Sequence, residues 1–228
     1  MRKTLLAASA LALAVAAPFA SAYQAGDIIV RAGAITVDPN ESSSNISTGV
    51  TGPLAGNKAT LDSDTQLGLN FAYMVTDNIG IELLAATPFQ HTVGVKGDTV
   101  PGLIGGDKFA DIKHLPPTVS ALYYPMDSNS AFQPYVGLGI NYTTFFSEDL
   151  SSGAKSAGFS GLSLQDSWGL AGQVGMDYFL TDNIMLNAQV RYIDIETTAT
   201  ARHSTLGKVK VDVDVDPWVY MVGLGYKF

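Results

Sequence analysis

The chain contains no cysteine among its 228 residues. Without thiols it can form no disulfide framework, no thiolate metal site and no cysteine nucleophile. Basic residues are also scarce, because 13 Lys and Arg stand against 21 Asp and Glu, for a formal net charge of −8. Proteins that bind nucleic acid need a basic surface to contact the phosphates. The charge balance therefore argues against a nucleic-acid partner.

The N-terminal segment contains the longest apolar stretch of the chain. Arg2 and Lys3 precede residues 5–17, which are small and apolar apart from Ser9, and the sequence Ala-Ser-Ala ends at Ala22. This order of a basic, an apolar and a small-residue part is typical of a secretory signal peptide. The apolar part is also shorter than the roughly 20 residues of a membrane-spanning helix. We expect residues 1–22 to be cleaved and residues 23–228 to form one domain.

Long hydrophobic runs are absent from the rest of the chain, so a helical membrane protein is excluded. The dominant pattern is instead an alternation with period two. In residues 65–75, one face is large and apolar and the other is small or polar. The first face carries Leu67, Leu69, Phe71, Tyr73 and Val75, and the second carries Gln66, Gly68, Asn70, Ala72 and Met74. This is the pattern of a strand that faces lipid on one side and a barrel lumen on the other.

Eight alternating segments can be counted, and the connections between them alternate in length. The segments lie near 28–37, 65–75, 79–88, 117–125, 131–146, 164–180, 184–198 and 208–228. Residues 76–78, 126–130 and 181–183 are short turns, whereas residues 38–64, 89–116, 147–163 and 199–207 are longer and polar. The sequence thus predicts an all-β fold, an eight-stranded antiparallel transmembrane β-barrel with short periplasmic turns and longer extracellular loops. It places the chain across the outer membrane of a Gram-negative bacterium, in contact with lipid and lipopolysaccharide.

The last segment carries two further signals. Gly223, Tyr226 and Phe228 fit the Gly-x-x-aromatic-x-aromatic ending of chains that the barrel-assembly machinery recognises. Farther from the terminus, Asp212, Asp214 and Asp216 share the outward parity of Trp218, so this part of the wall must rise beyond the lipid. Their inward neighbours are Val209, Val211, Val213 and Val215.

The lumen is predicted to be polar at one level and apolar at another. Eight strands enclose a space just wide enough for side chains or one small ligand, so a wide aqueous pore is excluded. Parity turns seven polar residues inward: Arg31, Gln66, Glu82, Asn141, Gln173, Asp177 and Arg191. Their simplest role is a paired plug, because an unpaired buried charge costs several kcal/mol; gating or ion selection is the alternative. Above them, Leu84 and the four valines either fill the tapering barrel or form an apolar cup for an alkyl chain.

Pro116 and Pro117 stand at the start of the fourth segment. Proline donates no hydrogen bond to a strand ladder, so pairing is weak there. The prolines either mark the end of pairing or border a gap between the third and fourth strands, through which cargo leaves sideways.

Catalysis and metal binding find little support. The three histidines, His91, His114 and His203, are expected in or next to external loops. A hydrolytic site needs a histidine within hydrogen-bond reach of a serine or aspartate, and no spacing here selects such a pair. We therefore predict that the protein is not an enzyme and holds no metal or cofactor.

Five blocks of the sequence resemble the OmpW family of small outer-membrane barrels. They are DNIGIELLAATPF (77–89), LPPT (115–118), PYVGLGINYTTFF (134–146), QDSWGLAGQVGMDY (165–178) and VDPWVYMVGLGYKF (215–228). The resemblance implies a barrel with a hydrophobic lumen, passive uptake of small hydrophobic molecules, as in relatives that serve in alkane uptake, and a lateral opening in the wall. It also implies a constriction made by a Leu, which matches Leu84, and a Trp, whose position is Arg191 in this chain.

The function predicted from these features is passive uptake of small hydrophobic molecules by a monomeric outer-membrane channel, with sideways release into the outer leaflet. Two alternatives stay open. The barrel can be a narrow channel for small polar solutes such as amino acids, which its inward polar residues favour. It can also be a structural or adhesive protein whose Ser- and Gly-rich loops form the contact surface.

Overall fold

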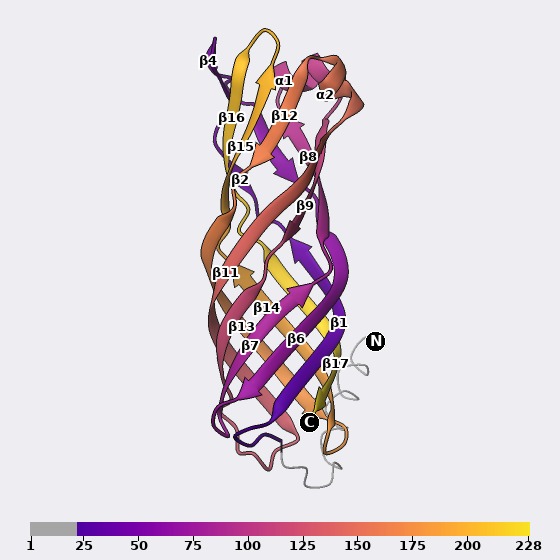
Figure 1. The fold of residues 1–228 in the computed structure, drawn as a ribbon, viewed down its shortest axis with the longest axis vertical. Coiled ribbons are helices and arrows are strands. Elements are labelled where there is room, and N and C mark those ends of the chain that lie inside the picture. The colour runs from indigo at the N-terminus through magenta and orange to yellow at the C-terminus, as the bar shows by residue number, and fades with distance from the viewer. Residues whose placement is uncertain (1–21) are drawn as a thin grey trace, which may run out of the picture.

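A computed structural model describes residues 22–228, so the predicted signal peptide lies, apart from Ala22, outside the described residues. Eight strands form a closed antiparallel barrel, as predicted (Figure 1). The sheet runs through neighbouring pairs from β10 to β11, and pairing of β10 with β11 closes it. The strands are β1 (Ile28–Asp38), β6 (Asp64–Met74), β7 (Ile79–Ala86), β10 (Thr118–Tyr123), β11 (Phe132–Leu150), β13 (Ser167–Phe179), β14 (Ile184–Ile193) and β17 (Trp218–Lys227).

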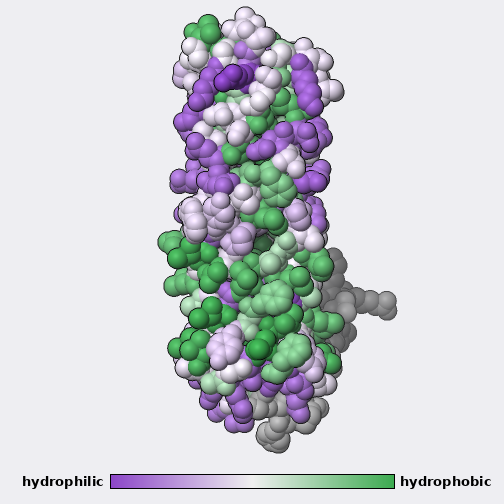
Figure 2. Space-filling view, viewed as in Figure 1, coloured by the Kyte–Doolittle hydropathy of each residue, from purple (hydrophilic) through white to green (hydrophobic). Residues whose placement is uncertain are grey.

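Side chains alternate between the two faces of the barrel wall. Along β6, Leu67, Phe71 and Tyr73 are about half exposed, whereas Asn70 and Met74 are fully buried. The outward apolar side chains form a belt around the lower half of the molecule, and the upper half is mainly polar (Figure 2). Near the upper edge of the belt, the aromatic rings of Tyr142 and Trp168 lie against each other, with centroids 4.7 Å apart. An apolar belt edged by aromatic rings is the outer surface of a barrel embedded in lipid.

The wall continues beyond the belt as two sheet extensions. On one side, β5 (Lys58–Leu61), β8 (Phe89–Lys96) and β9 (Lys108–Leu115) join the end of β11. On the other, β12 (Phe159–Leu164), β15 (Glu196–His203), β16 (Gly207–Asp214), β3 (Ser47–Thr48) and β4 (Gly52–Pro53) form a second sheet, with β2 (Ser42–Ser43) on β16. The short helices α1 (Thr99–Ile104) and α2 (Ser152–Ser156) lie at the tip (Figure 1). No helix within residues 22–228 is long and apolar enough to span a membrane.

The connections and the last two strands differ from the prediction. Much of the predicted loops 38–64, 89–116, 147–163 and 199–207 is strand. Conversely, the predicted strands 184–198 and 208–228 are each broken, at residues 194–195 and 215–217. Asp216 has a φ of 39° and Pro217 cannot donate to a ladder, so the chain bends there and passes from the barrel to the second sheet. Inward and outward residues alternate in the same phase on both sides of each break. For this reason the sequence pattern predicted one continuous strand where the structure has two.

The interior is layered along the barrel axis. At the end with the short turns, called the turn end, an aromatic cluster includes Tyr23, Tyr124, Tyr135 and Phe179. Next comes a layer of polar side chains, described below. An apolar layer that contains Leu84 follows, and a second apolar cluster lies under the tip, at the loop end. The chain enters and leaves the barrel at the turn end, where β1 begins and β17 stops (Figure 1).

Candidate functional site

A fully buried set of ion pairs crosses the lumen between β1, β7, β13 and β14. We call Arg31, Glu82, Gln173, Asp177 and Arg191 the polar network. Arg31 binds Asp177 through Nε and Nη2, at 3.0 and 2.6 Å, and reaches Glu82 through Nη1 at 3.1 Å. Arg191 donates to Glu82 at 2.7 Å and, through Nε, to Gln173 at 2.7 Å. Two guanidinium groups therefore face two carboxylates, and the set carries no net charge.

Neighbouring side chains add further hydrogen bonds to the network. The amide of Asn70 donates to Glu82 at 3.1 Å, and that of Asn187 donates to Asp177 at 2.8 Å. The hydroxyl of Tyr23 donates to Asp177 at 2.7 Å. Arg31, Glu82 and Asp177 are completely inaccessible to solvent. Since buried charges are tolerated only when paired and hydrogen-bonded, this arrangement closes the lumen at this level.

Five of the seven predicted inward polar residues belong to this network, and two lie elsewhere. Asn141 is buried beside the prolines, where its amide donates to the carbonyl oxygens of Pro116 and Pro117 at 3.1 and 3.2 Å. Gln66 is partly exposed nearer the loop end, where it bonds to Asp64 and Thr87. Parity gives the face on which a side chain lies but not its height along the axis, and that is the reason for the difference.

Sequence reasoning missed four partners of the network: Asn70, Asn187, Tyr23 and Tyr124. The alternation already placed Asn70 on the inward face of its strand, without assigning it to the polar set, and Asn187 carries the same inward parity. Tyr23 precedes the first strand and no periodic signal marks it, whereas Tyr124, which accepts from Arg31 at 2.8 Å, has the inward parity of the predicted segment 117–125. Both rings nevertheless lie in the lumen, with centroids 4.7 Å apart. Together with Phe179 they fill the turn end below the network.

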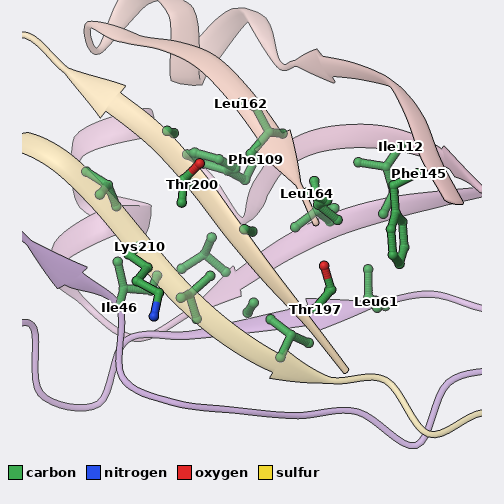
Figure 3. Close-up of a pocket in the computed structure, with 18 of the residues that line it drawn as sticks. Ile46, Leu61, Phe109, Ile112, Phe145, Leu162, Leu164, Thr197, Thr200 and Lys210 are labelled. Atoms are coloured by element: carbon green, nitrogen blue, oxygen red, sulfur yellow. The ribbon is translucent and has the colours of Figure 1, made fainter. Parts of the chain in front are cut away.

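An apolar cavity of about 70 Å³ lies inside the wall above the belt (Figure 3). Side chains from β12, β15 and β16, which belong to one sheet, face those from β5, β8 and β9 of the other sheet across it. All four predicted valines, Val209, Val211, Val213 and Val215, line the cavity. Leu84 does not line it; it is buried in the apolar layer between the cavity and the polar network. Its neighbours in that layer include Phe89, Ile193 and Val219.

The ladder between β7 and β10 stops below the cavity. The last pair is Leu84 with Thr118, and pairing resumes only with Phe89 and His114, between β8 and β9. We call residues 85–88 and 115–117, which do not pair with each other, the wall interruption; they include Pro88, Pro116 and Pro117. On its other side the chain stays attached to β11, because Tyr142 N donates to the carbonyl oxygen of Pro117 at 3.1 Å. The gap in pairing is therefore confined to one side of the prolines.

The histidines lie in strands rather than loops, in β8, β9 and β15. The rings of His91 and His114 stack with centroids 4.9 Å apart, and the ring of Phe89 stacks on His114 with centroids 5.5 Å apart. Within residues 22–228 no cluster of three or more His, Asp or Glu is arranged to hold a metal ion.

Comparison with known proteins agrees with this architecture. The OmpW family model matches residues 24–228. "Outer membrane protein W" of Vibrio cholerae is 46% identical over 228 residues, covering 100% of both chains, and that of Escherichia coli is 46% identical over 230 residues, again covering 100% of both. The crystal structure of the outer membrane protein OprG from Pseudomonas aeruginosa superposes with a TM-score of 0.86 at 56% identity, over 92% of this chain and 99% of that one. This chain therefore belongs to the OmpW family and is a β-barrel protein of the Gram-negative outer membrane.

Proposed function

We propose that this protein takes up small hydrophobic molecules passively from the outside and releases them sideways into the outer leaflet. The observation that carries the proposal is the apolar cavity at the loop end, lined by residues such as Val211, Val213 and Phe145, above a lumen that is closed by the polar network. Cargo enters from the loop end, occupies the cavity and leaves through the wall interruption.

The closed lumen argues against a route along the barrel axis. A solute moving toward the periplasm has to separate Arg31 from Asp177 and Arg191 from Glu82, and then pass the cluster around Tyr23 and Phe179. Removing one partner of a buried pair costs about 3–5 kcal/mol. The same cost applies to the alternative of a narrow channel for polar solutes. The polar network is better suited to block the lumen below the cavity, so that apolar cargo has to leave sideways.

The cavity suits an alkyl chain because it offers contact without hydrogen bonds. Burial contributes about 0.8 kcal/mol per CH₂ group, so a chain of six to eight carbons gains several kcal/mol of binding free energy. At about 70 Å³ the cavity is smaller than such a chain. Cargo must therefore part the side chains of β15 and β16 from those of β8 and β9, which pair only within their own sheets.

The wall interruption supports a sideways exit. Pro116 and Pro117 have no backbone N–H to offer, so the neighbouring strand loses its ladder partner at this point. Asn141 binds both proline carbonyl oxygens and holds the segment against β11. The opposite edge, residues 85–88, is fastened by Thr87 to Leu67 and Gln66 of β6. Each edge is thus held to its outer neighbour, and no ladder spans the opening.

Placing a carboxylate in the cavity tests hydrophobic uptake. Val211 is a partly exposed lining residue, so we expect the carboxylate of Val211→Asp to reach solvent and the barrel to fold. Loss of contact with two CH₂ groups corresponds to about a tenfold weaker binding. We expect uptake of a fluorescent alkyl probe by intact cells to fall by about this factor. Thr205→Asp, at the exposed turn between β15 and β16, is the matched control; equal uptake by both variants would contradict the proposal.

Restoring strand pairing tests the lateral exit. In the double variant Pro116→Val, Pro117→Thr, both positions regain an N–H group. The N–H at residue 116 becomes available to the opposite edge of the wall interruption, whereas residue 117 faces β11, where its carbonyl oxygen already accepts from Tyr142 N. We expect uptake of the same probe to slow while its binding to the purified barrel is unchanged, because only the exit is affected. The single variant Pro125→Val, at the turn after β10, controls for loss of a proline elsewhere. An unchanged rate in the double variant would show that the prolines only mark where pairing ends.

The partners that this proposal requires are lipid and lipopolysaccharide around the belt, small hydrophobic cargo in the lumen, and the barrel-assembly machinery during biogenesis. It involves no catalytic step and no cofactor. An adhesive role would leave the apolar cavity unused; such a protein would keep its function in Val211→Asp and lose it when the loop end is trimmed.

A further inference from the structure

Two buried imidazole nitrogens lack any hydrogen-bond partner directly above the wall interruption. They are Nε2 of His91 and Nδ1 of His114, and the two side chains are 2% and 4% exposed. His114 is the residue with which pairing resumes above the interruption. Buried polar atoms are nearly always paired in folded proteins. Three further unpaired atoms, on Asn70, Asn187 and Arg191, lie in and around the polar network. The two histidine nitrogens lie apart from it, on adjacent, stacked rings, and need an explanation of their own.

The protonation state of His91 follows from its neighbour. Its Nδ1 lies 2.5 Å from the carbonyl oxygen of Asp62. A carbonyl can only accept, so the ring carries its proton on Nδ1 and leaves a lone pair on Nε2. Burial lowers the pKa of His91 and lowers that of His114 to about 3, so both rings are neutral at physiological pH. His91 thus presents a hydrogen-bond acceptor inside the wall, with nothing donating to it.

These rings lie at the end of the apolar cavity. The ring of Phe145, which lines the cavity, lies against His114 with centroids 5.8 Å apart. Ile112, the cross-strand partner of His91, also lines the cavity, as does Leu61, next to Asp62. A molecule that passes from the cavity to the wall interruption must therefore pass the histidine pair. The cavity itself is lined by apolar side chains apart from Thr197, Thr200 and Lys210.

We propose that the histidine pair binds the polar head of an amphipathic cargo, a straight-chain alcohol or an undissociated fatty acid, whose hydroxyl donates to His91 Nε2. No partner fixes the tautomer of His114, so its Nδ1 can carry a proton and donate to an oxygen of the same head group. The alkyl chain then lies in the cavity. A pure alkane fits the cavity but leaves both nitrogens unpaired. This inference rests on the proposed function and narrows its substrate class to molecules with one hydroxyl or undissociated carboxyl group.

The test is nitrogen NMR on the folded, full-length barrel in lipid nanodiscs, with ¹⁵N-labelled histidine and methyl-labelled valine. With 1-octanol, we expect the Nε2 resonance of His91 to move in the direction of hydrogen-bond acceptance. With n-octane it should stay in place, although both probes shift the methyl groups of Val211 and Val213. His203, whose Nδ1 accepts from the backbone of Thr205 and Leu206 at the tip, is the internal control and should not move.

A second test compares the binding of octanol and octane to the wild-type barrel and to one variant. His91→Leu removes the acceptor and keeps an apolar side chain, and we expect it to weaken octanol binding about three- to tenfold, the effect of one neutral hydrogen bond, while octane binding is unchanged. If octanol shifts the valine methyl groups but not the His91 nitrogen, the histidine site is wrong and hydrophobic uptake stands. If neither probe shifts the valines, the proposed function fails as well.

Discussion

Glu82→Gln is expected to destabilise the barrel by about 3–5 kcal/mol, the cost of removing one member of a buried ion pair. Glu82 is the one residue of the polar network that both guanidinium groups contact, Arg31 through Oε2 and Arg191 through Oε1. Without its charge, two buried arginines remain with the single carboxylate of Asp177, which of the two contacts Arg31 only. The amide that replaces it can accept at one atom only, so one arginine loses its acceptor and faces an N–H group instead.

Urea unfolding of the purified barrel in lipid vesicles, followed by tryptophan fluorescence, measures this loss of unfolding free energy. Trp168 and Trp218 lie on the outer surface of the barrel, and their fluorescence reports transfer from lipid to water. Glu196→Gln is the matched control, because Glu196 is exposed on β15, beyond the belt. We expect it to change stability by less than about 0.5 kcal/mol, as surface substitutions usually do.

The double variant Glu82→Leu, Arg191→Leu tests whether charge pairing, rather than shape, causes the loss. It removes one positive and one negative charge and leaves the pair of Arg31 with Asp177 intact. Replacing a whole buried ion pair by apolar residues is often neutral, so this variant should be more stable than Glu82→Leu alone. A double variant as unstable as the single one would contradict this account of the network.

The barrel itself could be predicted from the sequence because lipid and lumen impose opposite chemistry on alternate residues. The strands β6, β13 and β17 show this alternation over their whole length. The extensions beyond the belt were harder to recognise. In β8 and β9 the inward residues include His91 and His114, and the outward ones face water, so the contrast between faces is weak. A polar outer face and Gly-rich flanks made these strands look like loops.

Besides the strands beyond the belt, alternation could not predict the height of a side chain along the barrel axis. It depends on strand tilt and on the register between neighbours, which are properties of the closed sheet. Arg191, for example, pairs in register with Gln173 and Val219, and only this register brings it to Glu82. Val209, Val211 and Val213 line one cavity together because they lie on the same face of one strand, β16. The environment of His91 and His114 is formed jointly by β8, β9 and β11. That their nitrogens have no partner could therefore not be inferred from the sequence.

Gly33→Ala and Gly223→Ala are both expected to prevent correct closure of the barrel. The two glycines are directly paired where β1 meets β17, the seam between the first and last strands. A Cβ atom on Gly33 would overlap the carbonyl oxygen of Val222, and one on Gly223 would overlap that of Ala32. These are backbone atoms and cannot rotate away. We expect each substitution to cost about 3 kcal/mol or more, at or above the upper range for overpacking.

The pair also separates two roles of the C-terminal strand. Gly223, with Tyr226 and Phe228, belongs to the proposed assembly signal, whereas Gly33 lies on β1, outside it. If backbone crowding at the seam is the cause, both variants should fail to give the folded, heat-modifiable band on unboiled gels. If recognition by the barrel-assembly machinery is the cause, only Gly223→Ala should fail in cells, and it should still fold from urea into lipid vesicles. Gly172→Ala is the control, because its Cβ would have no neighbour closer than Leu138 at 4.0 Å. Failure of Gly172→Ala would mean that any added methyl group on the wall is harmful, and the seam would then have no special role.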